Sequence, residues 1–193
     1  MLSSIPEHRN ATALDVFERA RAGDAAAFEQ LLLTHERQVL RLAFGLTNNL
    51  QDAQDVSQEV FLKLHRDLKK IRQSSEVPAW LYRVTVNACF DRKRKTKRSR
   101  LVPIEEAAVA WRSNSPSPED FARYQQDCRT LESGMQTLSD RERAAIALRE
   151  FEELSTAEVA QILGSTESTV RVQIAAARVK LRRFFEITRE KKL

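Results

Sequence analysis

The sequence is poor in the residues that break helices: its 193 residues include four glycines and five prolines. Few segments alternate apolar and polar residues with the period of two that marks half-buried strands. Apolar residues recur instead at helical spacing, and the apolar content is sufficient for packed cores. These features exclude the β-rich classes and predict an all-α protein.

Cysteine and histidine are scarce as well. Cys89 and Cys128 lie far apart, and the three histidines do not join them in a metal-ligand spacing. We therefore expect reduced thiols, as in the cytosol, and no metal or other cofactor. No apolar run approaches the roughly 20 residues that span a bilayer, and the N-terminal residues lack the apolar core of a signal peptide. The expectation is a cytoplasmic protein without membrane insertion.

The charge balance favours a polyanionic partner. Lysine and arginine number 32 against 27 acidic residues, which gives a net charge of +5. The densest basic run is RKRKTKR at positions 92–98. Such a run suits the phosphates of nucleic acid, although a solvated or disordered tail has the same composition.

A change in composition divides the chain. Residues 99–118 contain three of the five prolines and show no sustained period, which indicates a linker. We predict two small helical domains, over residues 12–98 and 119–188. Periodicity and capping residues predict helices over residues 12–22, 25–47, 51–69, from 79 onward and over 118–133.

Residues 154–182 have the pattern of a helix-turn-helix. Ser155 and Glu158 form a capping box, and Gly164 stands where the first helix must end. Ser165 or Thr166 caps a second, basic helix. A DNA-binding unit of this kind places its second helix in the major groove, whereas the alternative is an αα-hairpin buried in a core.

The predicted helix 51–69 has two contrasting sides. Its apolar side comprises Ala53, Val56, Val60, Leu64 and Leu68. On the other side, Asp52, Asp55 and Glu59 share one face at helical spacing. Three readings stay open: a solvated acidic face, a surface that docks on a protein partner, or a divalent-metal site, which in helical bundles usually uses inward-facing Glu and His.

The helix that begins near Pro78 combines aromatic and basic residues. Trp80, Arg83, Asn87 and Arg94 lie near one face, next to the basic run. Aromatic rings that stack on bases and cations that hold phosphates suit single-stranded or melted nucleic acid. A tryptophan in the core is the alternative for Trp80.

These segments in this order resemble the extracytoplasmic-function group of bacterial sigma factors. The motifs are DAQDVSQEVFLKL at positions 52–64, PAWLYRVTVNACFDRKRK at positions 78–95, a linker and the helix-turn-helix. The resemblance covers roughly residues 14–97 and 120–185. It implies a sigma region 2 domain before the linker, a sigma region 4 domain after it, and no catalytic activity.

The resemblance also implies roles by position. The clamp helices of the largest subunit of core RNA polymerase would be bound by Asp52, Asp55, Gln58, Glu59, Phe61 and Lys63. The −10 element would be recognised and melted by Trp80, Arg83, Asn87, Arg92, Lys93 and Arg94. The −35 element would be read by Thr166, Ser168, Thr169, Arg171, Gln173 and Arg178. An anti-sigma factor is a further implied partner.

The recognition helix departs from the family pattern. Gln173 and Ala176 stand where that pattern has arginines, so the −35 sequence is expected to differ from the commonest one, with Gln173 able to read an adenine. Two other functions are open at this stage. One is a stand-alone helix-turn-helix regulator, and the other is a metal-dependent nuclease or phosphotransferase that uses Asp52, Asp55 and Glu59.

Overall fold

The computed structural model describes residues 15–98 and 118–190, and this part of the chain contains helices and no strands. The all-α prediction is confirmed. After a helical segment over residues 15–22, the elements are α2 (Ala25–Thr47), α3 (Leu50–Asp67), η1 (Leu68–Lys70), η2 (Ser74–Glu76), α4 (Val77–Arg98), α5 (Pro118–Gln136), α6 (Asp140–Ile146), η3 (Ala147–Phe151), α7 (Thr156–Leu163) and α8 (Glu167–Glu190).

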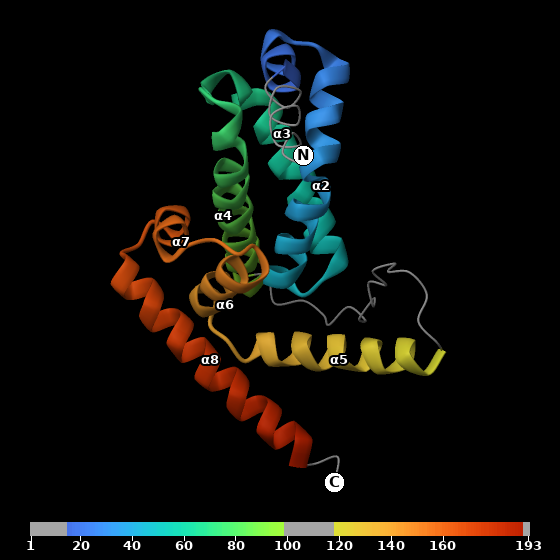
Figure 1. The fold of residues 1–193 in the computed structure, drawn as a ribbon, viewed down its shortest axis with the longest axis vertical. Coiled ribbons are helices and arrows are strands. Elements are labelled where there is room, and N and C mark those ends of the chain that lie inside the picture. Colours follow the sequence, from blue (N-terminus) through green and yellow to red (C-terminus); the bar gives the residue numbers. More distant parts are fainter. Residues whose placement is uncertain (1–14, 99–117, 191–193) are drawn as a thin grey trace, which may run out of the picture.

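The first part of the chain is a bundle of α2, α3 and α4, the upright helices of Figure 1. Asp24 caps α2 by accepting from the amides of Ala26 and Ala27, and Asn49 caps α3. The apolar side predicted for α3 is buried along its whole length. The sequence predicts that this helix ends at Lys69, whereas α3 ends at Asp67. The difference arises because η1 continues α3 to Lys70 as a tighter 3₁₀ turn.

The second part comprises α5 to α8. The predicted capping box from Ser155 to Glu158 forms, and a second one, from Ser139 to Glu142, begins α6. Gly164 ends α7 with a left-handed φ of 58°. The helix-turn-helix therefore has the local structure that the sequence predicts.

Some predictions fall beyond the described residues. Thr12, the expected start of the first helix, is one of them, and so are residues 99–117 of the predicted linker. Pro118 already belongs to α5, which continues to Gln136 rather than ending near Ser133.

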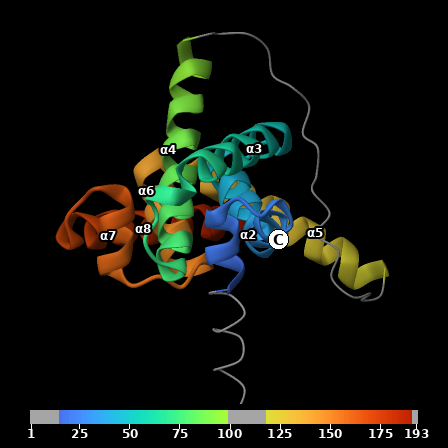
Figure 2. The ribbon, with the colours of Figure 1, turned by 90° about the horizontal axis from the view of Figure 1, so that it is seen from above.

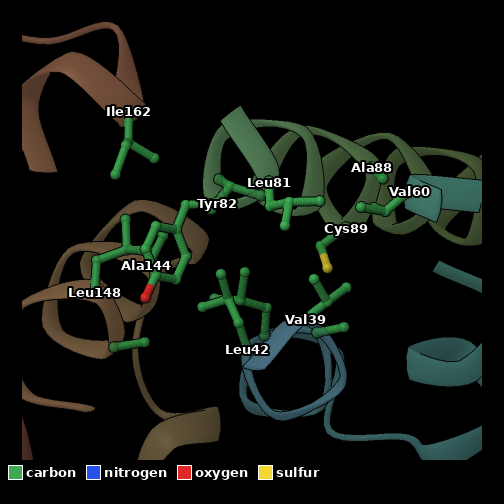
Figure 3. Close-up of a cluster of buried hydrophobic side chains, with 14 of the residues drawn as sticks. Val39, Leu42, Val60, Leu81, Tyr82, Ala88, Cys89, Ala144, Leu148 and Ile162 are labelled. Atoms are coloured by element: carbon green, nitrogen blue, oxygen red, sulfur yellow. The ribbon is translucent and has the colours of Figure 1, made fainter. Parts of the chain in front are cut away.

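The two parts are packed together. In Figures 1 and 2, α7 lies beside α4, on the side away from α3, and η3 and α6 contact α2. One buried apolar cluster contains residues of both parts. Figure 3 shows Leu42 and Tyr82 of the bundle next to Ala144 and Leu148. No pattern in the sequence predicts this closed arrangement. None of the described helices is both long and apolar enough to cross a membrane.

Candidate nucleic-acid and partner interfaces

The polar side of α3 is a surface of paired charges. Asp52 and Asp55 both accept from the guanidinium of Arg92 on α4, each at 2.6 Å. One turn further on, Lys63 donates to Glu59 at 2.6 Å, and Gln58 is exposed. Because the carboxylates already have cationic partners, this side of α3 presents acceptor oxygens in fixed positions.

Phe61 does not lie on this surface, contrary to the prediction. Its side chain is 7% exposed and belongs to the core, because the buried stripe of α3 is wide enough to contact both α2 and α4. The apolar residue that does reach solvent is its neighbour Leu62, which is 73% exposed. Leu62 was missed because the resemblance, rather than the helical spacing, selected Phe61.

The predicted −10 residues divide into two groups. Arg83, Asn87 and Arg94 are exposed, and Trp80 is half-buried at the start of the same face of α4. Arg94 pairs with Asp91 one turn earlier. This group is therefore brought together as predicted.

Arg92 and Lys93 point elsewhere. Arg92 turns towards α3, as described above, and Lys93 donates to Asp140 of α6 at 2.7 Å. Burial lowers the pKa of Lys93, and the bond to Asp140 partly opposes that shift. In this arrangement neither side chain lies on the face of α4 that carries Arg94, so the structure does not bring these two predicted −10 residues together with the rest.

A cleft separates the predicted −10 face of α4 from the helix-turn-helix. The residues that line it include Lys70, Glu76, Trp80 and Arg83 from the first part, and Glu158 and Gln161 from α7. The predicted −10 face thus forms one wall of this cleft along its first turn, and α7 forms the other.

The N-terminus of α8 carries a cluster of hydroxyls. The hydroxyl of Thr166 accepts from the amide of Thr169 at 3.2 Å and hydrogen-bonds the hydroxyls of Ser168 and Thr169. Thr166 is therefore the cap of the helix. These exposed groups, next to a helix N-terminus, are suited to phosphate oxygens.

The other three residues predicted to read the −35 element differ in accessibility. Arg171 is exposed and pairs with Glu167 at 2.7 Å, and Arg178 pairs with Glu150 of η3 at 2.5 Å. Gln173 is half-buried, and its Oε1 is a buried acceptor without a hydrogen-bond partner among the described residues. Gln173 is thus turned towards the protein, where it is poorly placed to read an adenine.

A carboxylate that the sequence analysis missed joins the two parts. Glu152 follows η3, and its side chain is 2% exposed. It accepts from the guanidinium of Arg41 at 2.8 Å and from the hydroxyl of Tyr82 at 2.8 Å. Gln38 also donates to Tyr82. Burial and the bond to Glu152 raise the pKa of Tyr82, which keeps the phenol protonated as a donor.

Arg143 makes a second connection. Its buried guanidinium donates to the backbone carbonyls of Met135, Gln136 and Leu138 near the end of α5, and to that of Leu46 in the last turn of α2. Burial lowers its pKa, with Asp140 opposing the shift. The sequence does hint at this burial, because Arg143 directly precedes three apolar residues, at positions 144–146.

No cluster of three or more histidine, cysteine or acidic side chains suited to a metal ion occurs in the described ranges 15–98 and 118–190. Asp52 and Asp55 instead share Arg92 as their partner. The structure therefore offers no support for the metal-dependent enzyme.

Comparison with known protein families gives two matches in chain order. Residues 31–99 match the sigma-70 region 2 model, and residues 128–181 match the sigma-70 region 4 model.

Several curated proteins are similar over most of this chain. ECF RNA polymerase sigma factor SigM of Mycobacterium tuberculosis is 33% identical over 162 residues, which cover 84% of this chain and 79% of the relative. RNA polymerase sigma-H factor of Pseudomonas aeruginosa is 32% identical and covers 83% of this chain and 87% of its own.

Two solved structures have the same fold. One is the sigma factor RpoE of Bartonella quintana in complex with the anti-sigma factor NepR, with a TM-score of 0.68, 21% identity, and coverage of 83% of this chain and 97% of that one. The other is CnrH in complex with the cytosolic domain of CnrY, with a TM-score of 0.65, 23% identity, and coverage of 91% and 97%.

Proposed function

Because this chain belongs to the extracytoplasmic-function group of the sigma-70 family of RNA polymerase sigma factors, we propose that three of its surfaces divide the work of promoter recognition. The chain is an alternative sigma factor, which binds core RNA polymerase and directs it to specific promoters. It is not an enzyme, since the polymerase carries out the synthesis. Its place of action under this proposal is the bacterial cytoplasm, on the nucleoid when it is bound to core.

The α3 surface is proposed to dock on the clamp helices of the largest polymerase subunit. Its members are Asp52, Asp55, Gln58, Glu59 and Lys63, with Leu62 in place of the buried Phe61. An exposed leucine within a ring of paired charges has the composition of an interface centre with a polar rim. Leu62→Ala is expected to weaken core binding about tenfold or more, measured by fluorescence anisotropy of the labelled chain against core polymerase.

The outer face of α4 is proposed to recognise and melt the −10 element. Its members are Trp80, Arg83, Asn87 and Arg94, and the indole of Trp80 is available at the cleft for stacking on an unpaired base. Extruding one base costs a few kcal/mol, which stacking and edge hydrogen bonds must offset. Arg92 and Lys93 join this face only after their carboxylate partners release them.

The −35 element is proposed to be read by α8. The hydroxyls of Thr166, Ser168 and Thr169 and the guanidinium groups of Arg171 and Arg178 are the groups that contact DNA. Phosphate contacts fix the register of the helix on the duplex. Each phosphate contact that is removed is expected to lower the salt slope of DNA binding by roughly one unit.

Run-off transcription with core polymerase is the test of this function. A product that depends on both the promoter and this chain is expected, and its absence would overturn the proposal. Tight and selective duplex binding without core polymerase would instead support a stand-alone helix-turn-helix regulator. The order of the two family matches, region 2 before region 4, carries the proposal.

An anti-sigma factor is proposed as a further partner. The similar structure of RpoE is a complex with the anti-sigma factor NepR, and that of CnrH is a complex with the cytosolic domain of CnrY. Affinity purification of the tagged chain from its own cells is expected to recover both core polymerase and a second small protein, in separate complexes.

A further inference from the structure

The outermost side of α8 is apolar. Val170, Ile174 and Ala177 face the core of the second part. The opposite side carries Ser168, Val172, Ala175 and Val179, all exposed, and we name these four residues the outer ridge. Val172 is 68% exposed and Val179 is 67% exposed. After Ser168, the ridge has no side chain that forms hydrogen bonds.

The surroundings of the ridge fit duplex DNA. Arg171 and Arg178 lie along one flank and Lys180 along the other. Each is paired with a carboxylate, from Glu167, Glu150 and Glu142 respectively, and would exchange that partner for a phosphate on DNA. Cations therefore border the apolar strip on both sides. The hydroxyl cluster around Thr166 lies at its N-terminal end. Figure 1 shows α8 as the long helix that runs away from the bundle; it packs on α5, α6 and α7 through its inner side. A strip bordered by phosphate-binding groups matches a groove between two phosphate backbones.

Gln173 is the side chain on this part of α8 that could hydrogen-bond a base edge, and it faces away from the groove. Oε1 of Gln173 is buried, so its amide cannot form the bidentate contact to adenine without a change of side-chain conformation. Ala176, the other position where the family pattern has arginine, has no polar atom in its side chain. The ridge must therefore discriminate between bases by apolar contact or by shape.

We infer that the outer ridge reads thymine methyl groups in the major groove of the −35 element. The C5-methyl of thymine is the apolar feature that distinguishes base edges in that groove, and small apolar side chains contact it. Val172 and Val179 are about 10.5 Å apart along the helix axis, a distance of about three base-pair steps. Each valine thus meets a different base pair. This inference rests on the proposed function, because it requires α8 to be the −35 reader.

Replacing thymine by deoxyuridine tests the inference, because it removes the methyl group and leaves the hydrogen-bonding edge intact. A −35 element is first selected from a randomised library with the reconstituted holoenzyme. Each thymine of the selected element is then replaced in turn. We expect at least two positions, about three base pairs apart, at which promoter binding weakens about fourfold, as expected for one buried methyl-sized group.

Two valine variants assign these contacts. In each of Val172→Ala and Val179→Ala, the ratio of the promoter affinities with thymine and with deoxyuridine is expected to fall to about one at a single base position. A different position is expected for each variant, as in a double-mutant cycle for one contacting pair. Leu33→Ala on α2 is the matched control, because Leu33 is 62% exposed and apolar but remote from α8 in sequence and fold. This control is expected to keep the full thymine preference.

Transcription and thymine preference, measured together, distinguish failure of this inference from failure of the proposed function. Promoter-dependent transcription without any thymine preference would overturn the inference and leave the proposed function intact. A complete lack of promoter-dependent transcription would overturn both. Self-association of the chain that Val172→Ala abolishes, again without a thymine preference, would reassign the ridge to contact with a second copy.

Discussion

The buried charge of Arg143, on α6, connects the C-terminal ends of two other helices, α5 and α2. Its guanidinium satisfies carbonyls at the ends of α5 and α2, where the last carbonyls of a helix lack partners within the helix. The C-terminal ends of helices also attract cations through their dipoles. Arg143 thus replaces water at the point where the two parts of the chain meet.

Arg143→Met should reveal that role. The methionine retains much of the apolar stem but leaves buried carbonyls without donors, which is expected to lower the free energy of unfolding by about 2–4 kcal/mol. Urea denaturation followed by circular dichroism measures it. Arg183→Met, at an exposed position of α8, is the control and should change the midpoint little. Equal midpoints for the two variants would contradict this role.

The two cysteines should differ sharply in reactivity. Burial raises the pKa of the Cys89 thiol to about 12, so almost no thiolate forms at neutral pH, and thiolate is the reactive species. Cys128 on α5 is partly accessible. We expect an alkylating reagent at pH 8 to label Cys128 alone in the folded protein and both cysteines in denaturant, as mass spectrometry will detect. Rapid labelling of Cys89 in the folded state would refute this.

At the scale of elements, the turn between α7 and α8 depends on one backbone conformation. Gly164 has φ of 58°, and a Cβ added there would meet no atom within 4 Å. The cost of a side chain at this position is therefore conformational and not steric.

Two alanine substitutions with opposite effects test this. Gly164→Ala is expected to destabilise the protein by about 1 kcal/mol, because the left-handed conformation is unfavourable for alanine. Gly45→Ala in α2 also meets open space, but its backbone is helical, so it should stabilise by about 0.5–1 kcal/mol. Thermal unfolding of both variants measures the two changes in stability. Changes of the same sign would show that packing, rather than backbone conformation, determines the effect of an added Cβ at these sites.

The helices themselves were predictable, and their contacts with one another were not. Capping boxes and apolar stripes act within one helix, so Ser139, Ser155 and the buried side of α3 could be recognised from spacing. The exposure of Leu62 and the inward turn of Arg92 depend on which helices lie alongside, and that depends on residues far away in sequence. Glu152 carries no local pattern, because its partners Arg41 and Tyr82 precede it by 111 and 70 positions.

For the whole molecule, the closed arrangement conflicts with simultaneous reading of both promoter elements. The −10 and −35 positions are about 25 base pairs apart, or roughly 85 Å on straight duplex at 3.4 Å per base pair. In the structure, α4 touches α7, and α7 leads directly into α8. Under the proposed assignment of α4 to the −10 element and α8 to the −35 element, the two helices must therefore move apart on promoter DNA. A chain of the length of segment 99–117 spans at most about 65 Å.

The contacts of Glu152 oppose that separation, so Glu152→Ala should favour the open form. The variant leaves the buried hydroxyl of Tyr82 without its acceptor, a loss of about 1–3 kcal/mol, and every 1.4 kcal/mol raises the ratio of open to closed molecules tenfold. When binding requires the open form, the apparent affinity rises with the open fraction. We therefore expect a larger radius of gyration by small-angle scattering and up to about tenfold tighter binding to core polymerase.

Glu150→Ala is the matched control for this prediction. Glu150 lies in η3, two residues earlier, but its partner Arg178 belongs to the second part of the chain, so its loss removes no contact between the parts. Glu150→Ala should leave the radius of gyration unchanged. If Glu152→Ala also left both the radius and the affinity for core unchanged, the apolar contacts of Tyr82 and Leu148 in Figure 3 would suffice to keep the chain closed. Opening would then have to be driven by polymerase itself, whose binding energy for the open form would need to exceed the energy of that apolar contact.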